Sequence, residues 1–215
     1  MNIQILFFFV FINVFSQNIS NKPKYKEDQI YLGVSYISLK NNIDDLKQNG
    51  FSRSFFIGFI NDISLNKKGD LALGIGLGYS NDKYISNLEY TFDNFENAYA
   101  FKVPIEKSDS NNYIKTHSLE LPFQFRWRNS TIDTYKFWRI HLGYKLKYIF
   151  YTKFDSIDLK KIKLNDIANF NHSINLSLGY NTWNIFFEYY MKSIIKSYDL
   201  NQLTPIKIGL IFYIL

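Results

Sequence analysis

The sequence predicts an all-β fold, an eight-stranded antiparallel up-and-down transmembrane β-barrel with a polar, filled lumen. Three observations predict it: segments in which apolar and polar residues strictly alternate, connections that alternate between short and long, and an apolar N-terminal stretch. Alternation with a period of two is typical of a β-strand that has one apolar face and one polar face.

The clearest alternating segment is "LELPFQFRWR", residues 119–128. Its odd-numbered positions are leucine, phenylalanine and tryptophan, whereas the other face carries Glu120, Gln124, Arg126 and Arg128. Eight alternating segments of this kind can be marked along the chain after its N-terminus. The predicted strands are residues 28–39, 51–64, 69–82, 113–128, 136–153, 170–180, 183–195 and 205–214.

The connections between these segments alternate in length. Short ones follow the second, fourth and sixth segments, and longer ones follow the first, third, fifth and seventh, of which residues 83–112 are the longest. This alternation is typical of outer-membrane barrels, which have short periplasmic turns and longer extracellular loops. An even number of strands then places both ends of the barrel sheet on the periplasmic side.

The N-terminus predicts export. Residues 1–16 are interpreted as a signal peptide and residues 17–215 as the barrel domain, because the apolar stretch from Ile5 to Phe15 is too short to span a bilayer as a helix. A buried N-terminal strand or helix is the alternative. The chain has no cysteine, which excludes a disulfide framework and thiolate metal sites. Its +6 formal charge is dispersed rather than clustered, so we expect no nucleic-acid partner.

Two closed barrels are compatible with the alternation. A soluble barrel would line its cavity with the apolar face, whereas a membrane barrel would turn that face toward lipid. Trp127, Trp138 and Trp183 lie beside the short connections, where an interfacial aromatic belt is expected. Small glycines (Gly74 and its even-numbered neighbours) would relieve crowding in a narrow lumen. These features favour a barrel in the cell outer membrane, in contact with its lipid.

The lumen of an eight-stranded barrel is just wide enough for side chains to fill it. We therefore expect the charged residues on the polar faces to form a structural plug rather than to line an aqueous channel. Pro122 is expected to cause a local bulge or break, because it removes a ladder hydrogen bond. The predicted lumenal charge network consists of Glu120, Arg126, Arg128, Arg139, Lys145, Lys147 and Glu188.

The sequence predicts no catalytic centre. His117, His141 and His172 are accompanied by no zinc-protease or nucleophile-elbow motif, and Ser118 beside His117 is too common a pair to indicate catalysis. We expect no enzymatic activity, no cofactor and no metal.

The stretch "FRWRNSTIDTYKFWRIHLGYKLKY", residues 125–148, resembles the PorT/SprT outer-membrane barrels of Bacteroidetes. The stretches "DISLNKKGDLALGIGLGYS" at residues 62–80 and "LGYNTWNIFFEYY" at residues 178–190 are similar to that family too. The resemblance implies a component or assembly factor of the type IX secretion and gliding machinery, with other secretion proteins as partners. The alternative is a generic small outer-membrane barrel, porin-like or adhesin-like, with no secretion role.

The short turns are the predicted docking surface for such partners. A filled barrel has only its rims with which to act, and short turns held by their strands lose little entropy on binding. The residues predicted to dock on the periplasmic rim are Lys67, Lys68, Asp133 and Lys136. The long connection at residues 83–112, rich in tyrosine and phenylalanine, is the competing surface.

Overall fold

The computed structural model describes residues 29–40, 46–48, 50–92, 98–102, 112–129, 137–156, 159–162, 166–196 and 203–214. The expected signal peptide at residues 1–16 lies outside these residues. Among the residues described, no helix is both long and apolar enough to cross a membrane.

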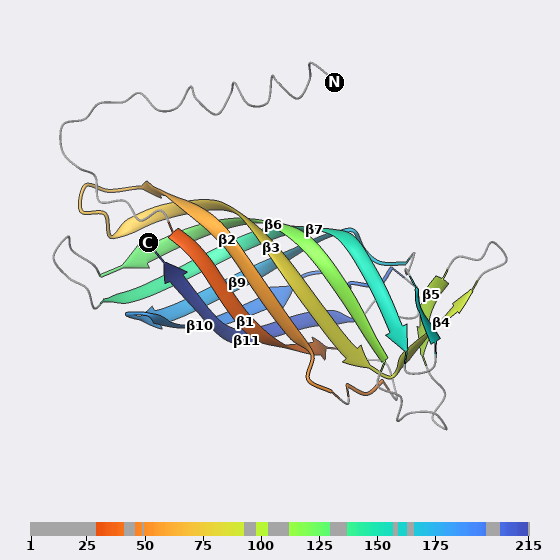
Figure 1. Ribbon diagram of the computed structural model, residues 1–215. Helices are drawn as coiled ribbons and strands as arrows, with labels where there is room; N and C mark the ends of the chain where they lie inside the picture. The colour runs from red at the N-terminus through yellow and green to blue at the C-terminus, as the bar shows by residue number, and fades with distance from the viewer. Residues whose placement is uncertain are drawn as a thin grey trace, which may run out of the picture.

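Eight antiparallel strands form a closed barrel, as the alternation predicts (Figure 1). The ring runs β1-β2-β3-β6-β7-β9-β10-β11 and closes where β1 pairs with β11 along the whole length of β11. The barrel strands are β1 (Gln29–Lys40), β2 (Arg53–Ser64), β3 (Leu71–Ser86), β6 (Asn112–Arg128), β7 (Trp138–Ser156), β9 (Phe170–Tyr180), β10 (Trp183–Tyr190) and β11 (Thr204–Ile214).

The two ends of the barrel differ. One end, called here the turn end, carries the short connections after β2, β6 and β9, the start of β1 and the end of β11. The opposite end, called the loop end, carries the long connections, and Figure 1 shows β4 (Leu88–Phe92) and β5 (Ala98–Lys102) paired beyond it. A short strand, β8 (Leu159–Ile162), extends the edge of β7 at the same end. The predicted alternation of short and long connections is thus confirmed.

Burial alternates along the strands of the barrel, where the structure describes it, in the sense expected of a membrane barrel. Side chains of the apolar faces point outward, so that Ile30 is 49% exposed, Phe123 42% and Leu142 53%. The polar faces point inward and are almost completely buried. Trp127, Trp138 and Trp183 lie exposed at the turn end, and Trp138 and Trp183 contact Tyr180 and Phe212. An apolar outer surface around a polar interior is the reverse of the arrangement in a soluble barrel and is the one expected of a barrel surrounded by lipid.

Two apolar clusters divide the polar interior. In the smaller one, the rings of Phe56 and Phe186 contact each other at a tilt, with 5.0 Å between their centres. The larger one closes the loop end, because the last residues of several strands and the segments beyond them pack together there. Its buried members are Ile37, Leu39, Tyr84, Leu88, Ile114, Ile149, Phe154, Ile167, Tyr190, Ile194, Ile195 and Leu203.

The structure corrects two expected boundaries. The predicted strand at residues 183–195 ends at Tyr190, because Ile194 and Ile195 turn into the loop-end cluster and Ile195 bridges to Ile167. The connection expected at residues 83–112 is partly sheet, since β3 continues to Ser86 and the β4–β5 hairpin follows.

Pro122 causes a break rather than a bulge. Pairing between β3 and β6 stops after Ile75↔Phe123 and resumes at Gly78↔Glu120 in the same register. On the other side Pro122 stays paired with Lys145 of β7. A proline has no N–H to donate, so it is tolerated where one ladder is interrupted. The register shift in β6–β7 lies elsewhere, between His117 and Ser118.

Candidate functional site

The interior toward the loop end holds a network of buried ion pairs centred on Asp82. Its carboxylate accepts hydrogen bonds from Lys147 Nζ at 2.6 Å, from Lys207 Nζ at 3.0 Å and from Ser54 Oγ at 2.6 Å. Tyr84 Oη donates to the same carboxylate at 3.0 Å. Each of these side chains is almost completely buried, so the charges are satisfied by one another rather than by water.

A second group of carboxylates extends this network across the barrel. Lys145 Nζ lies 3.0 Å from Glu120 and 3.2 Å from Glu188, and Lys147 Nζ lies 3.4 Å from Glu120. Ser173 Oγ donates to Glu188 at 2.6 Å. These residues come from β6, β7, β9 and β10, so the network ties neighbouring strands together from within.

The turn end has its own network, centred on Asp62. The carboxylate pairs with Arg126 and with Arg128 Nη1, the latter at 2.5 Å. Arg126 also bonds to Gln29 and to His141 Nε2, the latter at 3.4 Å. Arg128 Nε donates to the Gly69 carbonyl at 2.9 Å, which connects the network to the β2–β3 turn.

All seven residues of the expected lumenal network lie buried in the interior. The structure brings Glu120, Lys145, Lys147 and Glu188 together at the loop-end half, whereas Arg126, Arg128 and Arg139 lie at the turn end. Sequence reasoning missed three members, Asp62, Asp82 and Lys207. The alternation in the sequence could have identified them, because each of them occupies one of the alternate positions of its strand that point inward.

Of the two turns expected to dock partners, the structure describes the β2–β3 turn. Lys67 and Lys68 are exposed there, and Lys68 Nζ lies 3.1 Å from Asp70 Oδ2. Asn66 Oδ1 accepts a hydrogen bond from Gly69 N at 2.8 Å, and Gly69 adopts a φ of 78°, which glycine tolerates without strain. Hydrogen bonds from Asn66 and then Lys68 hold the pKa of Asp70 below its ordinary value. The other two expected docking residues, Asp133 and Lys136, lie outside the described residues.

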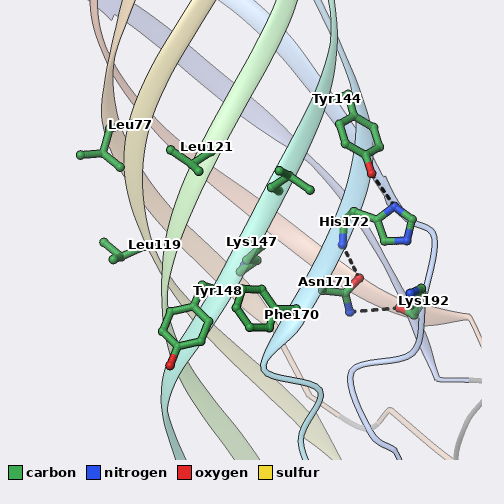
Figure 2. Close-up of a pocket in the computed structure, with 11 residues that line it drawn as sticks. Leu77, Leu119, Leu121, Tyr144, Lys147, Tyr148, Phe170, Asn171, His172 and Lys192 are labelled. Carbon is green, nitrogen blue, oxygen red and sulfur yellow. Dashed lines mark hydrogen bonds between the residues drawn. The ribbon is translucent and has the colours of Figure 1, made fainter. Parts of the chain in front are cut away.

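A hollow of about 520 Å³ opens on the outer wall over β6, β7 and β9 (Figure 2). Figure 2 shows Tyr144 directed toward His172, whose Nδ1 lies 2.8 Å from the tyrosine oxygen. Asn171 Nδ2 donates to the Lys192 carbonyl at 3.3 Å at the edge of the hollow. Most of the lining is leucine, tyrosine and phenylalanine of the exposed apolar face, so the hollow belongs to the lipid-facing surface.

The geometry around the other histidines gives no catalytic pair. Ser118 is buried in the interior, whereas His117 faces outward and contacts Tyr79 and Asn81, so these neighbours point to opposite sides of the wall. His141 lies inside among the arginines. Among the described residues, no group of three or more His, Cys, Asp or Glu side chains is arranged to hold a metal ion.

A known protein family covers most of this chain. The chain matches a family described as "Outer membrane protein beta-barrel domain" over residues 15–213. Among solved structures it is similar to Ail, the attachment invasion locus protein of Yersinia pestis, with 15% identity and a TM-score of 0.41, over 87% of this chain and 97% of that one. No curated protein matches the chain.

The family match covers nearly all of the barrel sheet, and the greasy exterior and polar interior have the arrangement that this family's environment demands. The protein is accordingly located in the outer membrane. By its sequence match and its closed eight-stranded fold, the chain belongs to the outer membrane protein β-barrel domain family.

Proposed function

We propose that this protein is a component or assembly factor of the type IX protein secretion and gliding machinery, acting through protein partners rather than as a pore or an enzyme. The observation that carries the proposal is the filled interior. In the described part of the barrel, buried ion pairs and an apolar cluster occupy the space that a solute would need to pass through. A small barrel without a passage acts through its rims. The resemblance to PorT/SprT barrels supplies the identity of the machinery.

The β2–β3 turn is suited to docking. Lys67 and Lys68 present two exposed cations, while the backbone beneath them is held by the bond from Arg128 N to the Asp70 carbonyl at 2.9 Å. The Leu65 N–H bonds to the Leu71 carbonyl at 2.9 Å across the base of the turn. A surface that is already ordered loses little conformational entropy when a partner binds.

The alternative is a generic small outer-membrane barrel with either a porin-like or an adhesin-like role. The structure of the interior bears on the first of these roles and not on the second. A porin-like role needs a wet passage, but Asp62, Asp82 and Lys207 are each 0% exposed. An adhesin-like role would use the loop end, which carries the β4–β5 hairpin. Secretion assays separate this second role from the proposal.

The first test is a deletion strain, scored for secretion of cargo with type IX C-terminal domains and for colony spreading. We expect loss of both, restored by the wild-type gene. Normal secretion and spreading in the deletion strain would reject the type IX assignment and favour the generic barrel.

The second test uses charge reversal on the rim, with Lys67→Glu, Lys68→Glu, Asp133→Lys and Lys136→Glu combined. We expect the variant to reach the outer membrane but to complement poorly. Lys192→Glu, an exposed lysine at the opposite end of the barrel, is the matched control and should complement fully. Full complementation by the rim variant would move the docking surface to the outer connection at residues 83–112.

A further inference from the structure

Four basic side chains stand in one row across four neighbouring strands. Arg53 of β2 pairs with Lys83 of β3, Lys83 pairs with Lys115 of β6, and Lys115 pairs with Lys153 of β7. Strands in a sheet are about 4.8 Å apart, so the row spans about 15 Å of the barrel wall. The sequence separates these residues by 30 positions or more, and only the strand register aligns them.

The row faces outward at the loop end. Arg53 is the first residue of β2, and Lys115 is near the start of β6, whereas Lys83 and Lys153 lie near the ends of β3 and β7. Arg53 is exposed and the three lysines are half-buried. Their strand neighbours point the other way, into the interior: Ser54, Asp82, Thr116 and Thr152 are all buried.

Such a row costs stability in the absence of an anion. Like charges directly opposite one another on neighbouring strands are destabilising. In the described part of the chain, the carboxylate that reaches the row is Asp155, 3.8 Å from Lys153 Nζ, and it also accepts a hydrogen bond from Tyr113 at 2.7 Å. Lys83 Nζ lies over the Tyr113 ring, 3.7 Å from its centre. Four cations with one carboxylate at their edge form an anion-attracting surface of fixed geometry.

The surroundings of the row have the layered chemistry of a lipid. Two hollows meet at Lys115: one of about 310 Å³ is lined by Arg53, Lys83 and Tyr113 among others, and one of about 400 Å³ by Lys153 and its neighbours. Two steps closer to the barrel middle, the paired outward residues are Phe55, Asn81, His117 and Tyr151, and two steps further they are Ile57, Tyr79, Leu119 and Tyr148. From the loop end toward the barrel middle, the outward side chains are therefore first cationic, then polar and aromatic, and then mainly apolar. A lipid has the same order, with its phosphate first, then its interfacial region and then its acyl chains.

We propose that the Arg53–Lys83–Lys115–Lys153 row is a binding site for a phosphorylated lipid headgroup in the outer leaflet. The long connections of outer-membrane barrels face the cell exterior, which places the loop end at that leaflet. Ammonium and guanidinium groups form short, charge-assisted hydrogen bonds to phosphate oxygens. The spread of four cations over two adjoining hollows suits a headgroup that carries more than one phosphate. The phosphates then supply the negative charge that offsets the repulsion within the row.

The test compares wild-type protein with a Lys83→Gln/Lys115→Gln variant in dodecyl maltoside micelles doped with diphosphoryl lipid A or with its dephosphorylated form. Binding is measured by native mass spectrometry and thermophoresis. Removing two cations near an anionic lipid is expected to weaken binding of the diphosphoryl form about 30-fold. Lys40→Gln/Lys192→Gln removes two exposed lysines from the same end of the barrel but outside the row, and should bind as wild type does.

Three readouts decide the proposal. Wild-type protein should prefer the diphosphoryl to the dephosphorylated lipid, and excess inorganic phosphate should compete poorly because it lacks the acyl chains. In phosphate-free micelles the Lys83→Gln/Lys115→Gln variant should unfold at the same or a higher temperature than wild type, since cross-strand repulsion is relieved. Equal affinity of wild type for both lipids, equal affinity of the variant and wild type for the diphosphoryl form, or equally tight binding of free phosphate would overturn the proposal.

Discussion

At the scale of single residues, the stability of the fold depends on charged side chains that are buried in the barrel interior. Asp62 and Asp82 each sit between two cations, and each is 0% exposed. Removing one member of a buried pair leaves the other charge without compensation, which costs far more than breaking a solvated pair. We therefore expect both aspartates to be sensitive to substitution.

Asp82→Asn should lower the free energy of unfolding by about 3–5 kcal/mol. The amide keeps the shape of the side chain but removes the negative charge that Lys147 and Lys207 share. Urea unfolding from lipid vesicles, followed by tryptophan fluorescence, measures the change. Lys68→Gln, which breaks an exposed ion pair, is the control and should leave stability nearly unchanged. A similar small effect for both variants would show that the Asp82 network contributes little.

Asp70 gives a pH-dependent signature of the turn. Hydrogen bonds from Asn66 and Lys68 lower its pKa below the ordinary 3.8, so the carboxylate favours the folded turn above the unfolded pKa. That contribution is lost as the pH falls through the folded value. Asn66→Ala should raise the pKa of Asp70 toward 3.8, which a carboxyl carbon NMR titration from about pH 5 to about pH 2 would detect. Titration of wild-type Asp70 at or above 3.8 would contradict the hydrogen-bonded turn.

At the scale of elements, strand β3 shows how the interior makes room for large side chains. A Cβ added at Gly78 would lie 2.1 Å from Tyr31 Oη, and one added at Gly74 would lie 2.9 Å from Arg126 Cδ. The inward face of β3 is therefore bare where its neighbours are bulky. This explains in packing terms the alternating glycines that the sequence displays.

Gly78→Ala should destabilise the barrel by about 1–3 kcal/mol, the usual cost of overpacking. The clash is with the Tyr31 hydroxyl, so the same substitution in a Tyr31→Phe background should cost less. Urea unfolding of the two single variants and the double variant measures the coupling. Strictly additive effects would mean that Gly78 is needed for some reason other than space for Tyr31.

At the scale of the whole molecule, two features block a passage through the described part of the barrel. They are the ion pairs in its polar interior and the apolar cluster at the loop end. In planar bilayers the protein should show no stable, large conductance, whereas a porin recorded in the same lipid should. A heat-dependent shift in gel mobility provides the check that the sample is folded. A reproducible porin-sized current would refute this block and support a transport function.

The sequence by itself determined the eight barrel strands, the face that each turns to lipid and the end that carries the short turns, because the period of two and the turn residues are local properties. It did not show β4, β5 or β8. It also placed Glu120, Arg126 and Lys145 on inward faces. It did not determine which of these inward side chains contact one another. Lys207 meets Asp82 across 125 positions and Arg126 meets Asp62 across 64, and the basic row at Arg53, Lys83, Lys115 and Lys153 exists only in the register of four strands. Those contacts were decided by the closure of β1 on β11 and by the stagger of the strands, which depend on the whole chain at once.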